Sequence, residues 1–124
     1  PEEAERNRQL LAALAGAVDA IDTGTDNSLL DFAALVDALD LLISSDSLAL
    51  HMAVARRRPV LCFFAPTSAA EIELYGRGAK GQSTAPDYCS YRKDADTSTL
   101  TVDRLLPAAL GLLEAHPASL AGRD

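Results

Sequence analysis

Apolar residues along the chain follow two patterns, a helical spacing of three or four residues and short continuous runs. The helical spacing predicts amphipathic helices over residues 2–17, 28–39 and 48–57. Continuous apolar runs predict strands over residues 41–44 and 60–64. The second run does not alternate with polar residues, which is typical of a parallel strand that is covered on both faces.

Caps and turn formers predict further elements. Ser28, with Asp31 three residues later, is expected to cap the second helix. Ser68 and Glu71 fit a capping box that opens a short helix to about residue 75. Thr101 is expected to cap a last helix over residues 102–115.

The remaining stretches are read from length and composition. Residues 18–21 are long enough for a short strand, and residues 22–27 form a polar loop rich in turn formers. Residues 76–91 are irregular, with one strand whose position the pattern does not fix. Because strands and helices alternate, we predict an α/β fold with a parallel sheet and right-handed crossovers.

Composition narrows the class of protein. The chain has 124 residues and is 48% hydrophobic, which is enough for one folded domain with a core. Its net charge of -7 argues against a nucleic-acid partner, and no apolar run is long enough to cross a membrane. Two cysteines and no visible signal peptide predict a reduced, cytoplasmic protein. Because the chain begins at Pro1 inside a charged helical stretch, we expect it to be part of a longer protein.

The best candidate site is the turn between the strand at residues 41–44 and the following helix. Free backbone N–H groups of Ser47 and Leu48 at a helix start can hold a phosphate or diphosphate. A carboxylate beside a phosphate is unfavourable, so Asp46 would instead accept hydrogen bonds from sugar hydroxyls. The alternative is that Asp46 only caps the helix, and the residues alone do not decide between the two.

Two further side chains belong to this hypothesis. His51 lies one helical turn beyond Ser47 and shares its helix face, where it can donate to a phosphate or a hydroxyl. A lone helical histidine is more often a structural residue. Thr67 follows the next strand and can face the same crevice.

Other motifs are set aside. The letters G-x-G-x-x-G occur at residues 76–81, but they follow a helix and open none, so we interpret them as a flexible basic loop that could cover an anion. Arg56, Arg57 and Arg58 suit a solvated helix end. Two histidines and two cysteines predict no zinc site, and no phosphate-cradling P-loop or Ser-His-Asp set is visible.

Taken in order, these motifs resemble a known family. Residues 45–53, the Arg58-Pro59-Val60 run and the Phe64-Ala65-Pro66-Thr67 run resemble the family-nine glycosyltransferases, the ADP-heptose:lipopolysaccharide heptosyltransferases. Residues 26–32 and 68–76 also look like one branch of this family. The resemblance covers roughly residues 18–93.

The resemblance implies a fold and a set of donor contacts. The fold would be a Rossmann-like parallel sheet with helices on both faces, part of the C-terminal half of a GT-B fold, with residues 1–124 as a single truncated nucleotide-sugar-binding domain. Asp46 would hold hydroxyls of the donor sugar or ribose. Ser47 would offer its hydroxyl and amide to the diphosphate, with Leu48, His51 and Thr67 beside it.

The resemblance also implies an activity and partners. The substrate would be a nucleotide-diphosphate sugar such as ADP-heptose, used without cofactor or metal in lipopolysaccharide or cell-envelope glycan synthesis. The catalytic base would lie in an N-terminal acceptor domain that these residues do not include, so we expect the chain alone to be inactive. Contact with the inner membrane would be peripheral, through the acceptor, and an open sheet edge would favour self-association.

The chain departs from the family pattern at two positions. Leu48 and Ala65 stand where the family has glycine. A leucine at this point weakens the case for close backbone approach to a phosphate and favours an alternative, a non-catalytic nucleotide-binding or interaction module on the same α/β scaffold. A scaffold without any small ligand is a third hypothesis. A transferase requires Asp46, Ser47, His51 and Thr67 to converge, whereas a scaffold lets them scatter.

Overall fold

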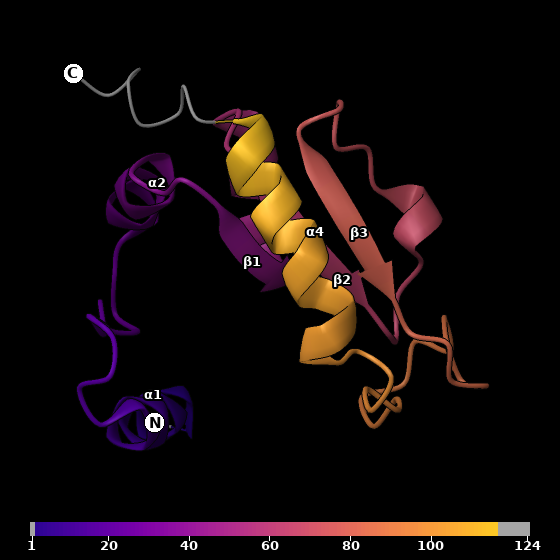
Figure 1. Cartoon of the computed structure of the whole chain (residues 1–124), viewed down its shortest axis with the longest axis horizontal. Helices are drawn as coiled ribbons and strands as arrows, with labels where there is room; N and C mark the ends of the chain where they lie inside the picture. The colour runs from indigo at the N-terminus through magenta and orange to yellow at the C-terminus, as the bar shows by residue number, and fades with distance from the viewer. Residues whose placement is uncertain (1, 117–124) are drawn as a thin grey trace. The chain divides into compact units, whose positions relative to one another are not determined.

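A computed structural model of the chain describes residues 2–116, which form two compact units that divide between Phe32 and Ala33 (Figure 1). The first unit contains α1 (Glu2–Leu14) and the polar segment that follows it. The second unit contains the sheet and the helices packed on it. Helix α2 (Leu29–Asp37) crosses the division between the units.

The second unit is built on a three-stranded parallel sheet in the order β1-β2-β3. Strand β1 spans Leu42–Ser45, β2 spans Val60–Phe64 and β3 spans Gly78–Gln82. The central strand β2 is almost wholly buried, and its run without polar alternation is therefore the parallel strand that the sequence predicts. The α/β fold with helices on both faces of a parallel sheet is confirmed.

Helices α3 (Leu48–Ala55) and α4 (Val102–Ala115) cover the sheet. Helix α3 packs on β1 and β2, and its Leu50 and Ala53 are completely buried. Helix α4 packs on β2 and β3 and crosses in front of the sheet in Figure 1. Both helices were predicted from the sequence; the bounds of α4 are those expected, whereas α3 ends at Ala55, two residues before the expected end.

The strand expected over residues 18–21 is absent, which corrects that prediction. These residues have no regular structure, and the side chains of Val18 and Ile21 are exposed. A strand of four residues is stable only when a neighbouring strand pairs with it, and the described residues provide none here.

The segment with the letters G-x-G-x-x-G is not a flexible loop. It contains β3, whose Gly78 pairs with Val60 of the central strand. Lys80 on this strand donates to the backbone carbonyl of Ala69 at 2.7 Å and also to that of Ile72. Its charge is therefore used to hold the preceding segment, and the expectation of an anion-covering basic loop is wrong.

The predicted capping box at Ser68 is also wrong. Ser68 makes no capping hydrogen bond, and only a three-residue 3-10 helix, Ala69–Glu71, forms there. The N–H group of Ala69 donates instead to the Tyr88 hydroxyl at 2.9 Å, and the Tyr91 hydroxyl donates to Glu71 at 3.0 Å. Two tyrosines from a later segment thus bind the Ala69 amide and the Glu71 carboxylate in place of a capping box.

The end of α3 is solvated at Arg56 and Arg57, as predicted, but two of its three arginines also approach Asp37. Arg56 donates to Asp37 with a closest approach of 3.1 Å, and Nε of Arg58 lies 3.7 Å from the same carboxylate. The side chain of Arg58 is only 20% exposed. Two of the three arginines therefore connect the end of α3 to the end of α2.

The cap of α4 offers a first test of the structure. The Thr101 hydroxyl accepts a hydrogen bond from the N–H of Arg104 at 3.3 Å, so Thr101→Ala should lower the free energy of unfolding by about 1 kcal/mol. Ser68→Ala is the matched control, since Ser68 makes no such bond, and should leave stability unchanged. Urea denaturation followed by circular dichroism measures both. Equal losses in the two variants would contradict the capping geometry.

Candidate functional site

A cavity of about 160 Å³ opens where β1 and β2 end. Asp46 follows β1 directly, and Ala65 and Pro66 follow β2, so the parallel register brings the two strand ends together. A third wall comes from a segment far along the chain. The lining residues are Ser45, Asp46, Phe63, Ala65, Pro66, Thr97 and Leu100.

The start of α3 lies directly beyond this cavity. Ser47 is the N-cap residue, with extended backbone at φ -155° and ψ 177°. Its hydroxyl makes no capping bond and instead shares a hydrogen bond of 3.0 Å with the hydroxyl of Ser44. The amides of the first turn are therefore not satisfied by the cap side chain, and the helix-cap interpretation of Asp46 fails because Ser47 holds that position.

Asp46 and His51 lie close together. The Nε2 atom of His51 is 3.7 Å from a carboxylate oxygen of Asp46. The Asp46 side chain is 23% exposed and that of His51 is 60% exposed, so the carboxylate is half-buried at the cavity while the imidazole faces solvent. The arrangement presents an acceptor and a ring donor side by side at the start of α3.

Thr67 does not join this group. It does not line the cavity, and its hydroxyl is buried without a hydrogen-bond partner among the described residues. The side chain of Leu48 is 59% exposed at the first position of α3. The structure thus brings Asp46, Ser47 and His51 to one sheet edge and leaves Thr67 outside the cavity.

The backbone around Pro66 is held by a later segment. The N–H of Cys89 donates to the Ala65 carbonyl at 2.9 Å, and that of Tyr91 donates to the Pro66 carbonyl at 2.7 Å. Both donors have left-handed backbone, with φ of 65° at Cys89 and 59° at Tyr91. Residues other than glycine rarely adopt this backbone conformation, so the interactions around Cys89 and Tyr91 must hold their backbone in place.

Asp46 is the one predicted site residue that lines the cavity, and Thr97 and Leu100 are the lining residues farthest along the chain that sequence reasoning missed. They lie between β3 and α4, about fifty residues from Asp46 in the sequence and outside any helix or strand. The density of Asp, Ser and Thr before the Thr101 cap is the available signal that this stretch folds into tight turns. It does not show which strand end the turns approach.

Cys62 lies under the site on the central strand and is fully buried. Burial, and secondarily the negative charge of Asp46, raises the pKa of the Cys62 thiol to about 12. The thiol is therefore neutral at physiological pH, as expected for a core residue, and takes no part as a nucleophile.

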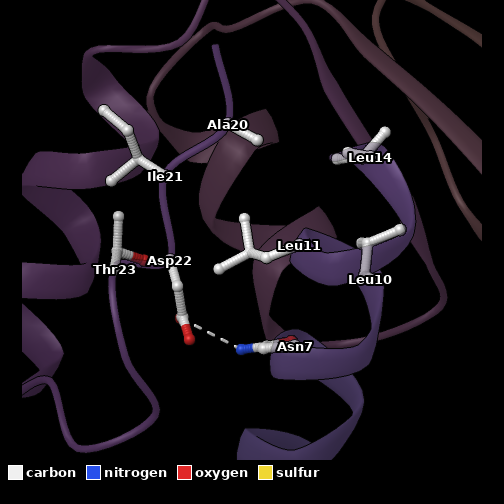
Figure 2. A pocket seen from close by; sticks show the side chains of 8 residues that line it. All are labelled: Asn7, Leu10, Leu11, Leu14, Ala20, Ile21, Asp22 and Thr23. Atoms are coloured by element: carbon white, nitrogen blue, oxygen red, sulfur yellow. Dashed lines mark hydrogen bonds between the residues drawn. The ribbon is translucent and has the colours of Figure 1, made fainter. Parts of the chain in front are cut away.

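Two other cavities contain none of the predicted site residues. An apolar cavity of about 250 Å³ lies against α4 and shares only Leu100 with the site cavity. Figure 2 shows one of about 190 Å³ in the first unit, where Leu10, Leu11 and Leu14 of α1 face residues 20–23. The side-chain amide of Asn7 donates to the Asp22 carboxylate at 3.1 Å across it.

Comparison with known proteins identifies the family. The family model for glycosyltransferase family 9 (heptosyltransferase) matches residues 1–101. No curated protein and no solved structure matches the chain. No helix among residues 2–116 has the length and apolar character needed to cross a membrane.

Proposed function

Because the chain belongs to glycosyltransferase family 9, the heptosyltransferase family, we propose that it forms the nucleotide-sugar-binding part of such an enzyme. The activity would be transfer of a sugar from a nucleotide diphosphate in cell-envelope glycan synthesis, with ADP-heptose as the leading donor. An acceptor domain of the same protein would supply the catalytic base. The isolated chain would then bind donor without turnover.

The proposal assigns the two parts of the donor to different groups. The diphosphate lies at the start of α3, against the backbone N–H groups of Ser47 and Leu48 and near the exposed His51 imidazole. The carboxylate of Asp46 stays clear of the phosphates and accepts hydrogen bonds from hydroxyl groups. The observation that carries this assignment is the turn of the Ser47 hydroxyl toward Ser44, which leaves the first-turn amides without a side-chain cap.

The same groups explain how transfer would be assisted. When the glycosidic bond to the nucleotide breaks, negative charge grows on the departing diphosphate. Fixed N–H dipoles at a helix start, together with the N–H group of His51, stabilise that charge without reorganising. The acceptor hydroxyl, deprotonated by the base of the acceptor domain, would attack the anomeric carbon from the face opposite the departing diphosphate, so the configuration would invert. The helix amides and His51 would take the place of a metal in stabilising the diphosphate charge.

An amide NMR titration of the chain with ADP, UDP and GDP tests the proposal. Shifts confined to Ser47, Leu48, His51 and their neighbours, with one nucleotide preferred, are the expected result. His51→Ala should weaken that binding about tenfold, equal to 1.4 kcal/mol. His116→Ala, at the end of α4, is the matched control and should bind as the wild type does. Absence of shifts with every nucleotide would contradict a donor site in this chain.

Two observations favour the alternative of a nucleotide-binding module without catalysis. Leu48 projects from the first turn of α3, and Thr67 lies outside the cavity. Both hypotheses predict nucleotide binding, so the discriminating measurement is sugar transfer by the longer protein. Turnover that His51→Ala reduces would establish the enzyme, whereas nucleotide binding without turnover would establish the module.

A further inference from the structure

The turn that contributes Thr97 and Leu100 to the wall of the site cavity is held in place by hydrogen bonds. Ser83, at the end of β3, is 2% exposed and donates to the Asp96 carbonyl at 3.2 Å. Its hydroxyl also shares a hydrogen bond of 3.1 Å with that of Thr99, which accepts from the N–H of Thr84 at 2.9 Å. These contacts fix the residues on either side of Thr97.

Further contacts attach the same turn to its flanks. The N–H of Asp96 donates to the Asp87 carboxylate at 2.9 Å, and that of Leu100 donates to the Thr97 carbonyl at 3.0 Å. Arg104 of α4 donates to the carbonyl of Gln82 at 2.9 Å and to that of Thr99. Thr97 and Leu100 are therefore set in place before any ligand arrives, which is the condition for selective binding.

The chemistry of the lining excludes the phosphates from this cavity. Asp46 contributes a carboxylate, and none of the lining residues carries a positive charge. An anion placed there would meet the Asp46 charge with no cation to offset it. The lining suits a neutral group whose hydroxyls donate to Asp46 and Thr97 and whose C–H surface rests on Phe63 and Leu100.

The size of the cavity fits one small ring. A cavity of about 150 Å³ accommodates a benzene molecule, and this one measures about 160 Å³. A whole nucleotide is too large for it. A single sugar ring that enters from the side of Asp46 matches both its size and its combination of hydroxyl and apolar surface.

From this geometry we propose that the cavity holds the sugar ring of the donor and that Thr97 and Leu100 determine which sugar is accepted. The proposal rests on the donor-binding function given above and extends it to the sugar. Thr97 acts as a specificity residue, because it lines the same cavity as Asp46 and belongs to the preformed wall. The nucleotide diphosphate remains outside, at the start of α3.

The test compares nucleotides with and without their sugar. Affinities of the 124-residue chain are measured by calorimetry for ADP and ADP-glucose, UDP and UDP-glucose, and GDP and GDP-mannose. Thr97→Leu fills the cavity and should weaken binding of the preferred nucleotide-sugar about tenfold, or 1.4 kcal/mol, while leaving the free nucleotide within twofold. Thr97→Val removes the hydroxyl at constant size and should weaken the nucleotide-sugar alone by a few-fold. Thr84→Leu, an exposed position outside the cavity, is the control.

The outcomes separate this inference from the proposed function. Suppose that the wild-type chain binds nucleotide, and that Thr97→Leu leaves the affinities for nucleotide and nucleotide-sugar unchanged or lowers both equally. The sugar assignment is then overturned and the donor site stands. If the wild-type chain binds neither ligand, the proposed function fails and the inference fails with it. Circular dichroism shows whether each variant is folded. If Thr97→Leu does not fold, Thr97→Val still distinguishes loss of the nucleotide-sugar alone from loss of both ligands.

Discussion

Replacing Gly78 with alanine is expected to lower the free energy of unfolding by about 1–3 kcal/mol, the usual cost of an overpacked core. A Cβ atom at this position would stand 2.6 Å from the Val60 carbonyl oxygen and 2.8 Å from a methyl group of Leu74. The carbonyl belongs to the backbone of the central strand and cannot rotate away. The two strands would have to separate at the Val60–Gly78 pair.

Gly111→Ala is the matched control for this prediction. Gly111 lies in α4, and a Cβ atom there meets nothing within 4 Å. The same chemical change should stabilise the protein by about 0.5–1 kcal/mol, because glycine lowers helix stability relative to alanine. Urea denaturation followed by circular dichroism measures both variants. A gain at Gly78 would contradict the close approach of β2 and β3, and a loss at Gly111 would contradict the open space around that position of α4.

The elements that sequence predicted well are those specified by their own side chains. Strand β2 is a run of large apolar residues with Pro59 before it, and burial on both faces follows from that run. Helix α4 combines an apolar stripe with the Thr101 cap, and both ends came out as expected. Local propensity and tertiary packing agree in these segments, so the pattern alone was sufficient.

The elements that sequence missed, or predicted without a position as it did the strand within residues 76–91, depend on partners far along the chain. Strand β3 has the sequence Gly-Ala-Lys-Gly-Gln, which has no β-branched or aromatic residue to predict a strand. It forms because Gly78 lets β2 approach closely and Gly81 leaves room for Leu105 of α4. The Ser68 capping box failed for the related reason that the amide of Ala69 donates to the hydroxyl of Tyr88, nineteen residues further along the chain.

The candidate site also contains both residues that the local sequence pattern predicted and residues that it missed. Asp46 and Ser47 were predicted because a strand and a helix on either side of them place the turn at the sheet edge. Helical spacing put His51 one turn beyond Ser47, whereas its 3.7 Å approach to Asp46, which precedes the helix, was not predicted. Thr97 and Leu100 reach the cavity only through the turn held by Ser83, which no local pattern encodes.

Asp46→Asn is expected to weaken binding of the preferred nucleotide-sugar about 10- to 100-fold, because hydrogen bonds to a charged acceptor are worth about 1.5–3 kcal/mol. The amide keeps the size of the side chain, so the cavity itself should persist. Affinity for the free nucleotide should stay the same or rise slightly, since one negative charge near the diphosphate is lost. Asp26→Asn makes the same charge change at an exposed position of the first unit and should bind as the wild type does.

The pattern of losses in Asp46→Asn also decides which hydroxyls the carboxylate holds. Ribose is present in both ligands, so a carboxylate that holds ribose would weaken the nucleotide and the nucleotide-sugar equally. A loss confined to the nucleotide-sugar places the donor sugar against Asp46, as the cavity walled by Thr97 and Leu100 requires. Unchanged binding of both ligands would contradict any contact between Asp46 and the donor, because a half-buried carboxylate that accepts hydroxyls cannot be neutralised without cost.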